Sequence, residues 1–385
     1  MTAATEQRVF GLDLLRAIAI VLVVFTHTSS IVSVRLYKAS VFTGFLGVEL
    51  FFVLSGFLIG TILLKINARP GKFEFKDIKV FWVRRWFRTL PNYYLMFFVY
   101  AIVFYTSHHG NVFAHTRYLS YLAFLQNSFS YQPADFFPIA WSLSIEEWFY
   151  LLFPLLLLLV SSLMKGTKAK SFVRTVLCIM VIELVLRLIM SLCFNHYWDE
   201  GYRKLMPLRL DSIDIGVLAA CIKFYRPVFW ERHTNALFAG GLAILAILSV
   251  YLYFNYINFS DPVYADHQIK TGLFLNTAFF TLASFSIALM IPGLYRFKLK
   301  QGLFTQAATL VSKISYSMYL THFLIILVVL HVFKQYATVW YINIAVFIGV
   351  WAATVLISWL QYQYFEVRVT ALRNKYSRAQ AAIKV

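Results

Sequence analysis

The sequence predicts an all-α membrane protein in which about ten helices cross the bilayer. Of its 385 residues 60% are hydrophobic and only 14% are charged, a composition too apolar for a water-soluble domain of this length. The apolar residues gather in ten runs, each about as long as a helix that spans the hydrocarbon core. These runs lie near residues 10–30, 43–64, 90–106, 141–163, 172–194, 208–224, 235–256, 271–292, 307–331 and 338–363.

The placement of Lys and Arg predicts the orientation in the membrane. If the N-terminus is cytoplasmic, 24 of the basic residues outside the runs lie on the inner side and eight on the outer side. The positive-inside rule therefore places both termini in the cytoplasm. The net charge of +18 then reflects topology and attraction to anionic lipid, and it does not indicate a nucleic-acid partner. We expect one transmembrane domain over residues 1–366 and a basic cytoplasmic tail over 367–385.

The first run, FGLDLLRAIAIVLVVFTHTSS, carries three ionisable side chains. Arg16 and His27 are separated by almost three whole turns of α-helix, so they share one face and lie roughly 16.5 Å apart along the axis. Asp13 lies one turn before Arg16 and is expected to neutralise it. Ionisable groups within a span generally face a protein interior or a wet cavity and mark a site. The alternative is structural, with an anchor at the interface and a histidine bonded to a neighbouring helix.

The second run, GFLGVELFFVLSGFLIGTILL, contains Glu49 in its outer half and the small residues Ser55 and Gly56, which we interpret as packing positions. The connection that follows is the most basic part of the chain and ends in KVFWVRRWFRTLPNYY. Arg85 and Arg88 are three apart and project from one side of a helix. Their guanidinium forks suit a phosphate-binding site on the cytoplasmic face. The alternative is a juxtamembrane anchor of basic and aromatic residues, and the two roles are compatible.

Three later motifs bring further ionisable side chains into the spans. They are Glu146 and Glu147 in WSLSIEEWFYLLFPLL, Arg209, Asp211 and Asp214 in RLDSIDIGVLAA, and His322 in ISYSMYLTHFL. Glu146 and Glu147 point about 100° apart, so one of them is expected to face the interior. The three cysteines and the histidines of segment 107–140 match no usual ligand spacing, and we expect no metal site.

Depth within each run indicates that six of these side chains share one layer in the outer half of the membrane. They are His27, Glu49, Glu146, Asp211, Asp214 and His322. Because unpaired ionisable groups are costly in hydrocarbon, we expect them to surround one cavity that opens outward. Arg16, Arg85 and Arg88 mark the inner face instead. This division suggests a phosphate-bearing donor inside and a polyhydroxylated acceptor outside, with a neutral histidine that takes a hydroxyl proton or carries an acyl group.

Six motifs in order resemble the acyltransferase-3 family of integral membrane O-acyltransferases, which modify surface polysaccharides and other hydroxyl-bearing molecules. They are LDLLRAIAIVLVVFTH, GVELFFVLSGFLI, RRWFRTLP, WSLSIEEWFYLLFPLL, RLDSIDIGVLAA and ISYSMYLTHF. Each motif is weak alone, but the ordered set extends over nearly the whole chain and is specific. The resemblance implies that His27 is catalytic and that Arg16 belongs to the same helix motif. It also implies that Arg85 and Arg88 handle acyl-CoA, and we assign Arg16 with them to the binding of this cosubstrate.

Glu146 and His322 match further motif positions, and we assign both to the catalytic set. The residues assigned to substrate binding are Glu49, Arg209, Asp211 and Asp214. The family often has Asp where Glu49 stands, which is a conservative departure. Some relatives carry an additional extracytoplasmic esterase-like domain that this sequence lacks, so the chain is expected to act alone or with a separate partner.

The main hypothesis is therefore an O-acetyltransferase of the bacterial inner membrane. It would take acetyl groups from acetyl-CoA, a cosubstrate and not a permanently bound cofactor, to a carbohydrate or glycolipid hydroxyl, with other glycan-assembly proteins as partners. Within the enzyme class, the alternatives are a small hydrophobic acceptor and a succinyl or longer acyl donor. A proton-coupled transporter or exporter is the alternative from another class, although the sequence lacks the inverted repeats or paired broken helices typical of one. The layer of ionisable residues disfavours a purely structural role.

Overall fold

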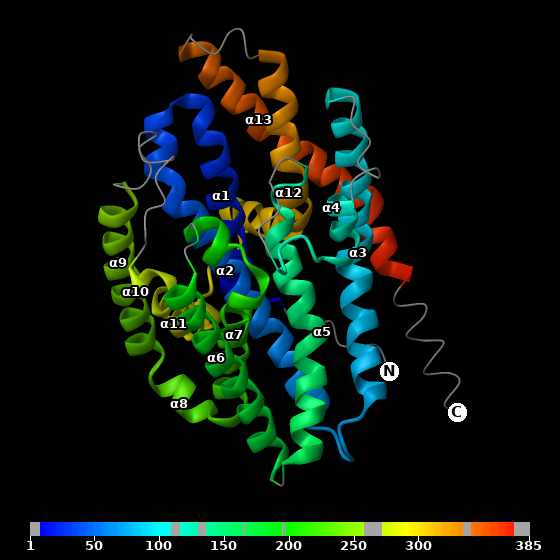
Figure 1. The fold of residues 1–385 in the computed structure, drawn as a ribbon, viewed down its shortest axis with the longest axis vertical. Helices are drawn as coiled ribbons and strands as arrows, with labels where there is room; N and C mark the ends of the chain where they lie inside the picture. The colour runs from blue at the N-terminus through cyan, green and yellow to red at the C-terminus, as the bar shows by residue number, and fades with distance from the viewer. Residues whose placement is uncertain are drawn as a thin grey trace.

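The computed structural model describes residues 8–108, 116–129, 136–164, 166–194, 196, 198–257, 272–333 and 340–372. Over these residues the chain is helical and forms no strand, as the sequence predicts, and the long helices run alongside one another in a bundle (Figure 1). The long helices are α1 (Phe10–Val32), α2 (Val34–Asn67), α3 (Phe75–His108), α5 (Ala140–Leu163), α6 (Lys168–Cys193), α7 (Leu210–Tyr225), α9 (Thr234–Ile257), α11 (Ala278–Arg296), α12 (Leu303–Phe333) and α13 (Trp340–Gln361). Short elements connect them: α4 (Thr116–Leu119), η2 (Ser120–Ala123), η3 (Trp198–Arg203), η4 (Met206–Leu208), α8 (Pro227–Arg232), α10 (Leu273–Asn276) and η7 (Tyr362–Glu366).

Eight helices of the described chain are long and apolar enough to cross a membrane, which confirms a multi-pass membrane protein. They are α1, α2, α5, α6, α9, α11, α12 and α13. Each of the ten predicted runs coincides with a helix, but α3 begins with a basic half and continues into a tyrosine-rich half, and α7 has only 16 residues. The count of ten and the side on which the termini lie therefore stay predictions. Residues 373–385 of the predicted tail, and 109–115 and 130–135 of segment 107–140, lie outside the described residues.

Helices α1 and α2 form the centre of the bundle. Helix α1 packs against α2, α11, α12 and α13, while α2 packs against α7, α9, α11 and α5. The crossing of α2 and α7 depends on two glycines: a Cβ on Gly56 would lie 1.8 Å from the carbonyl oxygen of Ile213, and one on Gly216 would lie 2.1 Å from that of Val53. Because only glycine allows this approach, the packing role predicted for Gly56 is confirmed.

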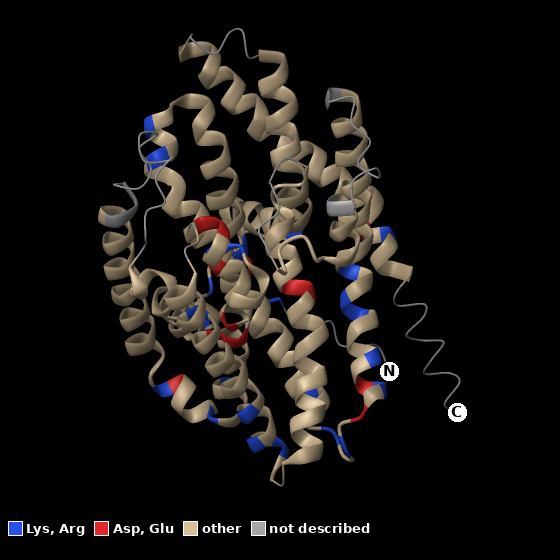
Figure 2. Ribbon diagram, in the orientation of Figure 1, with Lys and Arg blue, Asp and Glu red and all other residues tan. Residues whose placement is uncertain are grey.

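Charged residues are unevenly distributed over the bundle. Figure 2 shows many Lys and Arg residues at one end, around α8 and the connections from α2 to α3 and from α5 to α6, and both acidic and basic residues in the middle of the bundle. Charges buried among apolar helices need partners, since desolvation without compensation is costly.

Candidate functional site

A pair of histidines lies at the centre of the site. His27 on α1 and His322 on α12 are 295 residues apart in the sequence, yet Nδ1 of His27 lies 3.0 Å from Nε2 of His322. On its other side, Nδ1 of His322 lies 2.9 Å from the carbonyl oxygen of Met318. A carbonyl oxygen only accepts, so Nδ1 of His322 carries a hydrogen, and Nε2 of the neutral ring accepts one from Nδ1 of His27. This chain of bonds leaves Nε2 of His27 unprotonated and able to take a proton.

The ring of His27 lines a cavity, here called the histidine cavity. Its other lining residues include Tyr37, Val48, Trp141, Trp198, Asp199, Arg203, Lys204 and Tyr319. Asp199 on η3 forms ion pairs with both Arg203 and Lys204, and the guanidinium of Arg203 lies 4.7 Å from the centre of the Trp141 ring. Burial raises the pKa of the Asp199 carboxyl, but the two cations lower it by more, so its pKa lies below the ordinary value. Aromatic faces and fixed charges thus line the space next to His27.

A second cavity, here called the arginine cavity, brings together the three predicted arginines. Arg16 on α1 and Arg85 and Arg88 on α3 all line it. Asp13 attracts Arg16 only through its charge and forms its ion pair with another residue. The Asp13 carboxylate binds the Arg8 guanidinium at 2.7 Å and accepts from the Ser312 hydroxyl at 2.8 Å. Within the described part of the chain, the Arg16 guanidinium makes no hydrogen bond or ion pair, so its charge is available to an anion in this cavity.

Glu146 lies in the arginine cavity and not beside His27. Its carboxylate accepts from the Tyr150 hydroxyl at 2.5 Å and forms an ion pair with Arg85 at 3.4 Å. Tyr150 also receives a 2.5 Å hydrogen bond from Arg85 and bonds Ser55 at 2.5 Å. Ser55 therefore belongs to this network and is not only a packing residue. Sequence reasoning missed Tyr150, although its place one turn after Glu146 in the same motif put it on the same helix face.

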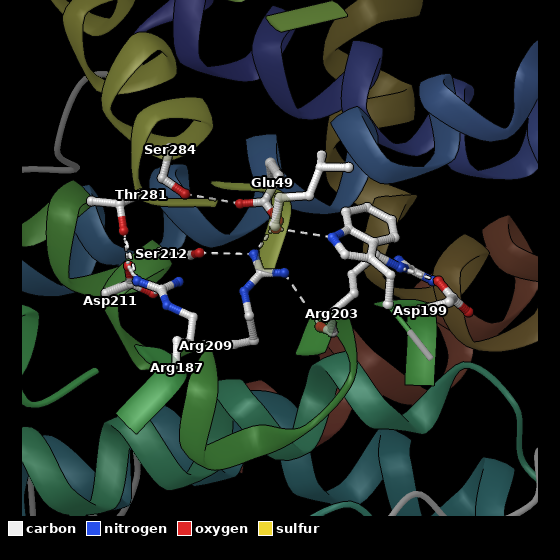
Figure 3. Close-up of polar contacts among 11 residues, drawn as sticks. Glu49, Arg187, Asp199, Arg203, Arg209, Asp211, Ser212, Thr281 and Ser284 are labelled. Carbon is white, nitrogen blue, oxygen red and sulfur yellow. Dashed lines mark hydrogen bonds and ion pairs between the residues drawn. The ribbon is translucent and has the colours of Figure 1, made fainter. Parts of the chain in front are cut away.

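Two buried ion pairs occupy the core around α7 (Figure 3). Glu49 forms an ion pair with Arg209 and accepts from Ser284 at 2.8 Å, with both charged side chains at most 1% exposed. Arg187 on α6 forms a 2.6 Å ion pair with Asp211, and both side chains are fully buried. The partners of these two carboxylates thus come from other segments of the bundle.

The structure does not gather the six predicted side chains around one cavity. His27 and His322 meet, Glu146 lies with the arginines, and the rest are buried outside both cavities. Those buried are Glu49, Asp211 and Asp214. The physical reason is that Arg187 and Arg209 reach into the same layer and neutralise two of the carboxylates in the core. Substrate binding by these residues and Arg209 stays a prediction.

The described helices define a multi-pass membrane protein whose bundle contains two cavities lined in part by charged side chains. The family model described as an acyltransferase domain matches residues 9–362, so the chain belongs to the acyltransferase-3 family. The O-acetyltransferase OatA of Staphylococcus aureus is 26% identical over an alignment of 396 positions, gaps included, that covers 96% of this chain. The peptidoglycan O-acetyltransferase OatA of Listeria monocytogenes is 34% identical over 178 residues, which cover 43% of this chain and 27% of the relative.

The chain spans 58% of the length of the Staphylococcus aureus relative. No solved structure matches it. The family resemblance that the six motifs carry is thereby confirmed over nearly the whole chain. The roles of single residues rest on the geometry described above.

Proposed function

We propose that the chain is an O-acetyltransferase that moves an acetyl group from acetyl-CoA to a hydroxyl of a carbohydrate, such as a surface polysaccharide or its lipid-linked precursor. One observation carries the proposal: the bond from Nδ1 of His27 to His322 leaves Nε2 of His27 unprotonated in a ring that lines a cavity. A positioned neutral imidazole is the usual general base of acyl transfer. The names of the relatives support acetyl as the group and peptidoglycan as one glycan to test.

In the proposed reaction, Nε2 of His27 takes the proton of the acceptor hydroxyl while the hydroxyl oxygen attacks the thioester carbonyl carbon. The tetrahedral intermediate then loses the CoA thiolate as the carbon–sulfur bond breaks. The proton passes from Nε2 to the sulfur, which leaves CoA as the free thiol. His322 holds the His27 ring through Nδ1 and stabilises the imidazolium, because its Nε2 accepts the hydrogen that Nδ1 carries. A transient acyl group on Nε2 is the alternative course for the same residue.

The arginine cavity is the proposed entry of the donor. Arg16, Arg85 and Arg88 line it, and guanidinium groups bind phosphate oxygens in bidentate geometry. Glu146, assigned to the catalytic set from the sequence, is proposed here to orient Arg85 through Tyr150. Acetyl-CoA enters as a cosubstrate.

The proposed topology puts the arginine cavity on the cytoplasmic side and the histidine cavity on the outer side of a bacterial inner membrane. The excess of Lys and Arg on the predicted inner connections supports this orientation. Both termini are then cytoplasmic. The donor comes from the compartment that makes acetyl-CoA, and the acceptor glycan, with any partner proteins that assemble it, lies outside.

The test uses membranes that contain the full chain, incubated with radiolabelled acetyl-CoA and peptidoglycan or lipid-linked glycan fragments. We expect label in the glycan with the wild type and at least a hundredfold less with His27→Ala, in line with the loss of a general base. The matched control is His331→Ala, which changes an exposed histidine on the same α12 helix as His322. Equal incorporation by the wild type and His27→Ala would remove His27 from the mechanism.

A further inference from the structure

The two cavities share part of their walls. Val48 and Tyr319 line the arginine cavity and the histidine cavity alike. Along α2, Ser55 lies in the first cavity and Val41 in the second, with Val48 halfway between them. Along α12, Tyr316 lies in the first cavity and Tyr319 one turn further on. The helices therefore pass from one cavity to the other at the level of these two side chains.

Tyr319 is held firmly in this position. Its hydroxyl donates to the carbonyl oxygen of Ile139 at 3.0 Å and meets the Ser142 hydroxyl at 2.5 Å. Its ring centre lies 6.2 Å from that of Phe51 and 5.9 Å from that of His322. Two hydrogen bonds and a packed ring restrict its rotation, so Tyr319 forms the fixed side of the wall.

Val48 lines both cavities from α2, and its side chain has no polar atom. It is buried in the same apolar core cluster as Tyr319. A larger or smaller side chain at position 48 therefore changes the space between the two cavities without breaking a hydrogen bond. The shared wall lies between the cavity of Arg16 and the cavity of His27, two residues separated by roughly 16.5 Å along the axis of α1.

We propose that Val48 and Tyr319 form the partition through which the acyl group reaches His27, and that the space beside Val48 limits the acyl group to short chains. This inference rests on the proposed function, because it assumes that the donor occupies the arginine cavity. A group that passes an apolar constriction is selected by the volume available to it. One methylene in such a pocket changes the specificity by about 10- to 200-fold.

The first experiment compares acetyl-CoA, butyryl-CoA and hexanoyl-CoA as donors in membranes with the full chain. Val48→Ala widens the partition, and we expect the ratio of butyryl to acetyl transfer to rise at least about tenfold. Val48→Ile narrows it, so this ratio is expected to fall. The matched control is Val53→Ala, because Val53 is buried on the same helix and lines neither cavity.

The ratio of butyryl to acetyl transfer is independent of how much folded protein each variant yields. Should Val48→Ala fail to accumulate, Val48→Ile still tests the opposite direction. A ratio that stays within twofold of wild type in the folded variants would overturn the proposal, as would an equal change in Val53→Ala. No transfer from any acyl-CoA by the wild type would instead overturn the proposed function, which is a different result.

A second experiment tests the partition without catalysis. Leu58→Cys places a thiol in the arginine cavity and Val41→Cys places one in the histidine cavity, in a chain whose three native cysteines are replaced by alanine. A charged, membrane-impermeant thiosulfonate is added to one face of sealed vesicles. We expect each thiol to react from one face only, and from opposite faces. Reaction of both thiols from the same face would overturn the partition whatever the enzyme does.

Discussion

His322 bonds Nδ1 of His27 at 3.0 Å and turns its own Nδ1 to the carbonyl oxygen of Met318 at 2.9 Å. One histidine thereby sets the tautomer of the other. In a catalytic triad, a third group orients the base. Here His27 is the base, and the group that orients it is the neutral imidazole of His322, which is held in turn by a backbone carbonyl.

The role of His322 as a positioning residue can be tested by substitution. We expect His322→Ala to lower kcat of acetyl transfer about a hundredfold, because His27 loses the acceptor that holds its ring. His322→Gln is expected to recover part of this loss, since a glutamine side-chain oxygen accepts from Nδ1 of His27. The measurement is the pH profile of transfer from acetyl-CoA by each variant. Equal losses in the two variants would contradict the assignment of the tautomer.

If the arginine cavity binds acetyl-CoA, removing two of its arginines should weaken that binding. Arg85→Ala combined with Arg88→Ala is expected to raise KM for acetyl-CoA about 10- to 100-fold, since a hydrogen bond to a charged group contributes about 1.5–3 kcal/mol. The measurement is steady-state transfer with varied acetyl-CoA, and the control is Arg84→Ala, an exposed arginine on the same helix that does not line the cavity. An unchanged KM would contradict a role in acetyl-CoA binding and favour the alternative, in which Arg85 and Arg88 anchor the helix at the membrane surface.

The buried ion pair of Glu49 and Arg209 predicts a loss of stability. Glu49→Ala leaves Arg209 without its partner in the core, and breaking a buried pair in this way costs about 3–5 kcal/mol. We expect a clear fall in Tm of the purified protein in detergent, with recovery in the double variant Glu49→Leu and Arg209→Met. If Glu49 binds substrate instead, Glu49→Ala would leave Tm unchanged and raise KM for the acceptor.

Asp199 predicts a dependence of stability on pH. Its pKa lies below the ordinary carboxyl value in the folded protein because Arg203 and Lys204 outweigh the effect of burial. The stabilisation is therefore fully present above the unfolded pKa of about 3.9 and is lost as the pH falls through the lower folded pKa. We expect Asp199→Asn to lower Tm at pH 7, and the gap from wild type to shrink at about pH 3. A gap that is the same at both pH values would contradict the ion pairs.

Much of the fold followed from local features of the chain. Run length and composition predicted the helices, because a span must satisfy its backbone within itself and present apolar side chains to lipid. Helical periodicity also gave Arg16 and His27 one face, and the structure puts them in two cavities along that helix. These expectations depend on residues within a few turns of one another.

The partners of the buried charges could not be predicted in this way. Asp13 binds Arg8 and not Arg16, and Arg187 binds Asp211 from another helix, because packing of the bundle decides which side chains come within reach. The depth of a residue in its span likewise does not say which neighbour it faces, so the residues expected at one level are divided among two cavities and the buried core.

By itself the sequence determined that this is a multi-pass membrane protein of the acyltransferase-3 family, and that its first helix carries an arginine and a histidine on one face. Only the tertiary structure decided that His322 orients His27, that Glu146 joins the arginines through Tyr150, and that Val48 and Tyr319 stand between the two cavities. The physical reason is the range of each cause. Helix formation and membrane insertion act along the chain, whereas the bond of His27 to His322 and the shared cavity wall join residues that are far apart in the sequence.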